Sequence, residues 1–471
     1  MENSESDIAV DTTASSIRDK PEGELPLVLN AGFGVGALGV AILVNLTATL
    51  LPPFMTNFLG IGAGVVATIL LVTKLYDVVT DPLMGIISDR TESRWGRRRP
   101  YLFLGGVVGA LGLVLLFVPP ELDNATYLIG YFVIALLISY TGYTLFNVPH
   151  LAMAAEMARN YHARTILMTY RTGFMMAGGF IAASSFALVQ WLGNDRAAHV
   201  PVAVGFGAII FLACYLCFVG TASAEQTKKT SHTYSIMEQV RSALSNRPYV
   251  FLLSAKLCQL FGITSAGATA IYFKVGVLKL DYAFISSYIM IVTIFSVAAL
   301  PMWARASKAL GKRDVYMGAA AGYALVTLSW LLASPGDPNL GLYIRGACLG
   351  ICVAGILILG PALLPDTIEY DYLKTGLRRE GIFSSFYTTM EKLAAAMGPS
   401  VILLVLGWYG YQSGTEGWSV DQPESAVSAI YACAAVVPAV MCLLSIGILY
   451  FYDLSEKELE RLRDQRHENA S

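Results

Sequence analysis

The chain has 471 residues, of which 55% are hydrophobic and 14% charged, and its formal net charge is −2 at pH 7. Soluble domains carry about 25% charged residues, so this composition excludes an ordinary soluble enzyme, and the lack of basic excess excludes a nucleic-acid partner. Twelve membrane helices of about 20 residues need about 240 apolar positions, and 55% of the chain is about 259 residues. The composition therefore predicts an all-α integral membrane protein with twelve transmembrane helices.

Twelve apolar runs follow one another along the chain. Six lie near residues 27–51, 61–87, 101–119, 127–152, 166–192 and 201–221, and six more near 249–273, 283–304, 314–333, 341–364, 380–410 and 426–452. We expect two pseudo-symmetric six-helix halves around a central cavity, over 27–221 and 249–452. The polar segments are predicted to be an N-terminal tail (1–26), a central loop (222–248) and a C-terminal tail (453–471) in which Leu454–Arg466 forms a solvated helix.

Basic residues set the expected orientation, because cytoplasmic loops collect Lys and Arg. Of the 32 Lys and Arg residues, 24 fall in the tails and loops on the side of the N-terminus, and three fall on the opposite side: Arg196, Lys274 and Lys279. The other five lie inside predicted spans. This distribution predicts a multi-pass plasma-membrane protein, of the bacterial inner-membrane kind, with both termini cytoplasmic. We expect the first span, rather than a cleavable signal peptide, to direct insertion.

The second predicted span carries charges that are costly in lipid. Lys74, Asp77 and Asp81 are spaced i, i+3 and i+7, which places them on one face of a helix. A carboxylate at mid-membrane costs about 2.5–3.5 kcal/mol on insertion scales, and two carboxylates one turn apart repel each other unless a positive charge lies between them. We expect a bound Na⁺ or a shared proton at this pair. A Lys74–Asp77 salt bridge, with Asp81 near the cytoplasmic surface, is the alternative.

Polar residues in three other spans could complete such a site. Span 4 contains Tyr140, Thr144 and Asn147, of which the last two form an oxygen-bearing patch at i, i+3. Arg171 in span 5 either extends toward the cytoplasmic surface or contacts a solute. Lys392 in span 11, with Thr388 one turn earlier, needs a counter-charge, and the nearest acids are those of span 2. No Ser/His/Asp set, HExxH or Walker A motif appears, so we predict no enzymatic activity and no cofactor besides the coupling ion.

The loop after span 2 carries a recognisable pattern of glycine, acid and arginine. This loop motif comprises Gly85, Asp89, Arg90, Arg97, Arg98 and Arg99, and it resembles the loop motif of the major facilitator superfamily. The longer string Tyr76-Asp77-Val-Val-Thr80-Asp81-Pro82, with Leu364-Pro-Asp366-Thr-Ile-Glu369 before span 11, resembles the glycoside–pentoside–hexuronide:cation symporter family over nearly the whole chain. The resemblance implies that Asp89, held by arginines, stabilises one state of two rocking halves.

The resemblance also assigns roles to single positions. It implies that Asp77 and Asp81 coordinate the cation, that Thr80 tunes the choice of ion, and that a hydroxyl from Thr144 lies near the ion. It further implies that Arg171 and Lys392 are cavity cations that couple the solute to the ion. We place Lys74, Tyr140 and Thr388 with these coupling residues, and Asn147 with the ion ligands.

Two departures from the family concern the solute. Positions that carry acids in galactoside-transporting members hold Ala41 and Asn147 here, and the aromatic residue that stacks on the sugar is replaced by Leu151. Galactoside recognition is therefore not expected, while the cation site is largely kept.

We predict a secondary transporter, acting as a monomer, that couples inward movement of Na⁺ or H⁺ to uptake of a small solute, a sugar or glycoside, by alternating access. Three alternatives stay open at this stage. The first is a cation-coupled carrier of a lysolipid-like or organic-anion solute on the same fold, the second a non-transporting sensor, and the third a uniporter.

Overall fold

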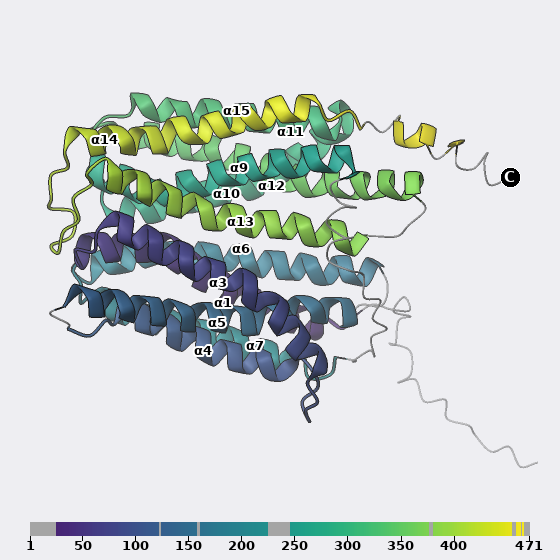
Figure 1. Ribbon diagram of the computed structural model, residues 1–471, viewed down its shortest axis with the longest axis horizontal. Helices are drawn as coiled ribbons and strands as arrows, with labels where there is room; N and C mark the ends of the chain where they lie inside the picture. Colours follow the sequence, from purple (N-terminus) through teal and green to yellow (C-terminus); the bar gives the residue numbers. More distant parts are fainter. Residues whose placement is uncertain are drawn as a thin grey trace, which may run out of the picture.

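The computed structural model describes residues 25–121, 124–157, 161–224, 245–375, 380–454, 458–462 and 464–465. Within these ranges every regular element is helical. Twelve helical stretches are long and apolar enough to cross a membrane, and they run side by side along one direction (Figure 1). The prediction of an all-α membrane protein with twelve spans is confirmed.

The first half of the chain supplies six of these stretches. The first runs over Leu27–Phe58 and joins α1 (Leu27–Asn45), η1 (Leu46–Leu50), α2 (Leu51–Pro53) and η2 (Phe54–Phe58). The next five are α3 (Ala63–Arg90), α4 (Arg99–Phe117), α5 (Ala125–Met157), α6 (Tyr161–Trp191) and α7 (His199–Gly220).

The second half supplies the other six. They are α9 (Arg247–Ile271) continued by η3 (Tyr272–Val277), α10 (Tyr282–Leu310), α11 (Lys312–Leu328) continued by η4 (Ser329–Leu332), α12 (Asn339–Thr375), α13 (Glu380–Trp408), and a last stretch made of α14 (Glu424–Tyr431), η5 (Ala432–Val436) and α15 (Val437–Tyr450). Each falls on a predicted apolar run. The largest extension is in α12, which continues beyond the predicted end at residue 364 through Pro365 to Thr375.

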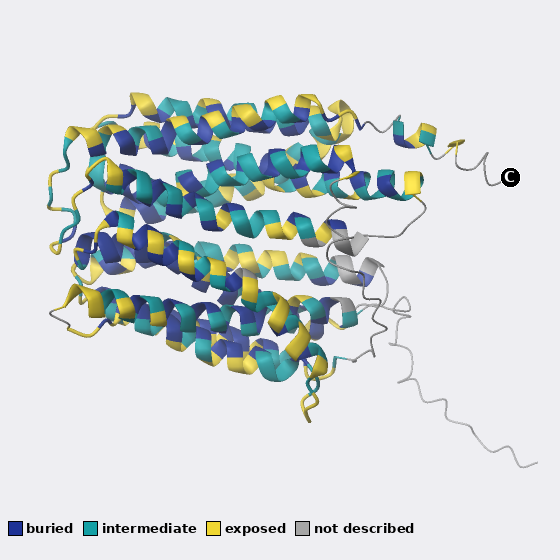
Figure 2. Cartoon of the chain, in the orientation of Figure 1, coloured by how far each residue is buried: buried dark blue, intermediate teal, exposed yellow. Residues whose placement is uncertain are grey.

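The predicted tails and central loop lie largely outside the described residues. Of the expected C-terminal helix over Leu454–Arg466, residues 454, 458–462 and 464–465 are described, and all of these except Leu454 are helical. Large apolar side chains are exposed on the outer helices, among them Leu212, Leu325 and Leu443, and exposed and buried residues mix along every helix (Figure 2). Such surfaces suit a lipid environment, because apolar side chains are favourable in hydrocarbon and a helix bonds its backbone polar groups within itself.

Glycines let neighbouring helices pack backbone to backbone. A Cβ atom on Gly142 of α5 would overlap the backbone N and Cα of Gly109 on α4, and one on Gly32 of α1 would lie 2.8 Å from the Cα of Gly220 on α7. Lipid tails are as apolar as the helix surfaces, so close van der Waals packing between small residues holds such helices together.

The two halves are bonded to each other at the end of the bundle away from the C-terminus, where α14 begins (Figure 1). The Ser286 hydroxyl of α10 donates to the Ala183 carbonyl of α6 at 2.8 Å. The Tyr411 hydroxyl donates to the Asn57 side-chain oxygen at 2.8 Å, and the backbone N–H of Gly414 donates to the Thr56 carbonyl at 3.0 Å. We call this region the closed end of the bundle.

The α4–α5 contact leads to a stability prediction. We expect Gly142→Val to destabilise the protein by about 1–3 kcal/mol or more, because the added side chain meets backbone that cannot move aside. Gly130→Val on the same helix is the matched control, since nothing lies within 4 Å of a Cβ there. Thermal unfolding in detergent measures both variants, and equal melting temperatures for the two would contradict the packing described.

Candidate functional site: a carboxylate pair between the halves

The site begins with two aspartates on one face of α3. Asp77 is buried, with 6% of its surface exposed, and the Asp81 side chain is 12% exposed. The apolar sequence on either side makes this segment a membrane helix, and the i, i+4 spacing brings the two carboxylates to one side of it. Two acids thus lie close together where water is scarce.

A single hydroxyl from α5 joins the two carboxylates. Thr144 Oγ1 lies 3.2 Å from Asp77 Oδ1 and 3.0 Å from Asp81 Oδ1. A hydroxyl has one proton, so it can donate to only one of the two carboxylates at a time. Three oxygens from two helices therefore converge. Only one of the two contacts of Thr144 Oγ1 with the carboxylates can be a hydrogen bond donated by the hydroxyl at any time.

Each carboxylate also meets a lysine. Lys74 Nζ lies 3.3 Å from Asp77 Oδ2, and it sits 4.1 Å from the centroid of the Tyr140 ring. Lys392, which comes from α13 in the other half, forms an ion pair with Asp81. The cluster of Lys74, Asp77, Asp81 and Lys392, which we call the charge cluster, is therefore balanced and spans both halves.

The charge cluster includes the Lys74–Asp77 bridge that was the alternative to a cation site, so that bridge is present. The cation paired with Asp81 is accessible to exchange, because the Lys392 side chain is 42% exposed. No group of three or more His, Cys, Asp or Glu residues able to hold a metal occurs in the part of the chain that the structure describes. The oxygens present suit a monovalent cation or a proton.

Two predicted ion ligands lie outside this oxygen set. The Thr80 hydroxyl donates to the Tyr76 carbonyl of its own helix at 3.1 Å, as threonines within helices commonly do. The Asn147 amide donates to the Tyr143 hydroxyl at 3.1 Å. In this conformation neither side chain forms a hydrogen bond with the carboxylate of Asp77 or Asp81, and their assignment to the cation site stays a prediction.

The remaining predicted coupling residues lie on the two halves. On α6, Arg171 keeps its Nε buried without a hydrogen-bond partner, and no ion pair to it is found among the described residues. On α13, Thr388 is exposed one turn before Lys392. Near it Glu391 pairs with buried Lys256 of α9 at 3.1 Å, so Glu391 already has a counter-charge.

The loop motif forms an ion-pair network inside the first half. Arg98, only 5% exposed, binds Asp89 at 2.6 Å and Glu156 at 2.9 Å, and Arg97 binds Glu156 at 2.5 Å. These bonds join the end of α3, the start of α4 and the end of α5. Glu156 was missed from the sequence, because nothing in its spacing relates it to arginines 58 and 59 residues away.

The other members of the loop motif lie outside this ion-pair network. Arg99 donates to the Phe218 carbonyl of α7 at 2.7 Å and stacks on the Phe218 ring. Arg90 is exposed, and Gly85 lies inside α3 with only Val148 near a potential Cβ.

Comparisons with known proteins place this arrangement in a family. The family model described as "MFS/sugar transport protein" matches residues 32–456. A putative glycoside/cation symporter of Escherichia coli is 25% identical, covering 92% of this chain and 93% of its own, and the isoprimeverose transporter of Lactiplantibacillus pentosus is 27% identical, covering 90% and 88%. The crystal structure of the nucleoside transporter NupG superposes with a TM-score of 0.62 at 12% identity, over 90% of this chain and 100% of that one, which shows the fold.

Twelve helices in the major facilitator fold, with charges held between two halves, define a membrane transporter and not an enzyme. The chain belongs to the MFS/sugar transport protein family. The resemblance to the glycoside–pentoside–hexuronide:cation symporters is thereby confirmed.

The ion-pair network at the loop motif leads to a second stability prediction. Arg98→Gln removes the buried guanidinium that bridges Asp89 and Glu156, although Arg97 still binds Glu156, so we expect a loss of about 1–3 kcal/mol. Arg90→Gln, in the same motif but exposed, should leave the melting temperature within about 1 °C, because surface charges contribute little. An Arg98→Gln melting temperature that matches the Arg90→Gln value would refute the network.

Proposed function

We propose that the chain is a secondary active transporter that couples the inward movement of Na⁺ or H⁺ to the uptake of a sugar or glycoside by alternating access. The printed names of relatives, a glycoside/cation symporter and an isoprimeverose transporter, support this class of solute. The observation that carries the proposal is the charge cluster, in which two acids of one half share a hydroxyl and one of them is paired with a lysine of the other half.

A cation enters this account as a competitor of the lysines. Between Asp77 and Asp81, close to Thr144 Oγ1, it would meet three oxygens and neutralise the repulsion of the two acids. Asp81 then needs Lys392 less, because a carboxylate already balanced by a cation gains less from a second positive charge. Cation binding therefore weakens the one ion pair of the cluster that crosses between the halves.

Weakening that pair changes which arrangement of the halves is favoured. Asp81 and Lys392 sit on α3 and α13, which pack against each other across the halves, so a rocking motion separates or joins them. The solute must bind the cation-loaded form more tightly than the cation-free form, since differential affinity is the only source of coupling. We propose that three of the coupling residues contact the bound solute: Arg171, Thr388 and Tyr140.

The proposed orientation follows from the basic loops. The loop motif, at the end of the bundle where the C-terminus lies, would face the cytoplasm of a bacterial cell, and the closed end would face the outside. Both termini would be cytoplasmic, as an even number of spans requires. In this orientation the described conformation is closed to the outside.

Neutralising Asp77 tests the ion site. We expect Asp77→Asn to lower cation-driven accumulation in proteoliposomes about 5–150-fold, which is the range of typical coupling energies, while exchange of solute without a gradient continues. Glu121→Gln, an exposed loop carboxylate, is the matched control and should transport normally. An Asp77→Asn protein that still concentrates solute against its gradient would remove Asp77 from the coupling mechanism.

Removing the ammonium of Lys392 tests the contact between the halves. We expect Lys392→Gln to bind solute with an affinity that no longer depends on the cation, because Asp81 then has no partner in the other half to lose. Equilibrium binding of a transported glycoside at low and high cation concentration measures this dependence. Lys308→Gln, exposed on α10, is the control, and an unchanged cation dependence in Lys392→Gln would contradict the role proposed.

A further inference from the structure

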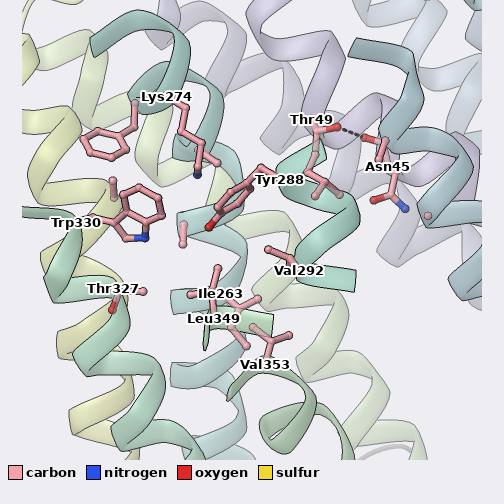
Figure 3. Close-up of a pocket in the computed structure, with 18 of the residues that line it drawn as sticks. Asn45, Thr49, Ile263, Lys274, Tyr288, Val292, Thr327, Trp330, Leu349 and Val353 are labelled. Atoms are coloured by element: carbon pink, nitrogen blue, oxygen red, sulfur yellow. Dashed lines mark hydrogen bonds between the residues drawn. The ribbon is translucent and has the colours of Figure 1, made fainter. Parts of the chain in front are cut away.

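A second feature between the halves, an apolar cavity with one buried lysine, lies toward the closed end. A cavity of about 280 Å³ opens there between the halves (Figure 3). The first half contributes parts of α1, η1 and α6, and the second half contributes α9 to α12 with η3, η4 and η5. None of the four residues of the charge cluster lines it.

The walls of the cavity are mostly hydrocarbon and aromatic rings. Its apolar lining includes Phe186, Ile263, Val292, Leu349 and Val353. Two of its threonine hydroxyls already donate to backbone carbonyls, Thr49 to Asn45 and Thr327 to Tyr323. A sugar ring with many hydroxyl groups would find few free partners on such a surface, whereas an apolar body would be well covered.

One charged side chain projects into this apolar space. Lys274 of η3 is 5% exposed, and its ammonium lies 4.2 Å from the centroid of the Tyr288 ring and 4.8 Å from that of Trp330. Figure 3 shows the amine between these two rings at the edge of the cavity. Among the described residues, no carboxylate pairs with it and no hydrogen bond from it is found.

The surroundings of Lys274 carry an excess of positive charge. Arg345 lies on the same Trp330 ring, 5.4 Å from its centroid, and Arg345 is paired with Asp337 at 3.7 Å. Asp337 is thus the partner of Arg345 and, among the described residues, forms no ion pair with Lys274. The Tyr288 hydroxyl is buried without a hydrogen-bond partner, so a second donor is available beside the ammonium.

A buried ammonium is unfavourable unless it is paired, and two aromatic rings replace only part of the lost hydration. A carboxylate bound by Lys274 and the Tyr288 hydroxyl would supply both the missing charge and the missing acceptor. Sequence reasoning placed Lys274 in a loop outside the membrane, because the apolar run ends at Phe273. The structure corrects this, since η3 carries the helix on to Val277 and turns Lys274 inward.

We propose that this cavity binds an organic carboxylate with an apolar body, whose acid group contacts Lys274 and Tyr288 and whose hydrocarbon or aromatic part lies against Ile263, Val292 and Leu349. The carboxylate belongs either to the aglycone of a glycoside or to a free acid. The inference deepens the proposed function, because it assigns a chemical class to part of the solute.

The test compares two probes that differ in one charge. Purified full-length protein is titrated by calorimetry with 4-carboxyphenyl β-glucoside and with the neutral 4-(hydroxymethyl)phenyl β-glucoside. We expect the acidic probe to bind at least about tenfold more tightly, a difference that corresponds to one good charged contact. Equal affinities of the wild-type protein for the two probes would overturn the proposal without any need for a variant.

Variants then assign the preference to Lys274. Lys274→Met should remove the tenfold preference while leaving the neutral probe unaffected, and Tyr288→Phe should reduce it less. Lys279→Met, at an exposed lysine five residues further on, is the matched control, and melting temperatures check that each variant is folded. An acidic probe that binds Lys274→Met as tightly as wild type would show that the two rings hold Lys274 for structure only.

Two further experiments distinguish a free acid from the acid of an aglycone, and failure of this inference from failure of the proposed function. Binding of benzoate alone supports a free acid, and binding of the acidic glucoside without benzoate supports an aglycone. The titrations are repeated without Na⁺ and at several pH values. Tighter binding of the acidic probe that persists under these conditions supports this inference, even if cation-driven uptake fails. Cation-driven uptake without a preference for the acidic probe overturns the inference and leaves the proposed function in place.

Discussion

The ion pair between Asp81 and Lys392 is the contact on which the rest of this transporter depends. It joins α3 of one half to α13 of the other, in a region where an unpaired charge is costly. Lys74, Asp77 and Thr144 complete a cluster whose charges sum to zero. A balanced cluster of this kind is sensitive, because one added cation leaves one lysine without a partner. In the mechanism that we propose, this cluster binds the ion, and its Asp81–Lys392 pair links the two halves.

The closed end and the charge cluster both join the halves, but by contacts of different kinds. Hydrogen bonds such as Ser286 to Ala183 and Tyr411 to Asn57 fix the halves at one end, while the pair to Lys392 is exposed enough to be replaced. The apolar cavity with Lys274 also has walls from both halves. On the two proposals made here, a solute in this cavity and a cation at the cluster would both act on the relative position of the halves, and they would be coupled through it without direct contact.

The sequence was sufficient for whatever depends on local spacing. Apolar runs identified all twelve spans, and the i, i+3, i+7 spacing placed Lys74, Asp77 and Asp81 on one face. It was insufficient where a side chain chooses between local and distant partners. Thr80 bonds its own helix, Asn147 bonds Tyr143, and Glu156 meets Arg97 and Arg98 only after folding. Lys274 was misplaced by one turn, because the helix continues after the hydropathy falls. Such outcomes depend on tertiary packing, which periodicity does not encode.

Infrared difference spectroscopy of the purified protein tests the central claim most directly, because it detects the carboxylates themselves. Exchange of an inert cation for the coupling cation should shift the carboxylate stretching bands of the wild-type protein, as Asp77 and Asp81 lose lysine contacts and gain the ion. The Asp77→Asn, Asp81→Asn double variant should show no such shift. Identical difference spectra for the two proteins would contradict the account, because the ion would then bind somewhere other than the acid pair.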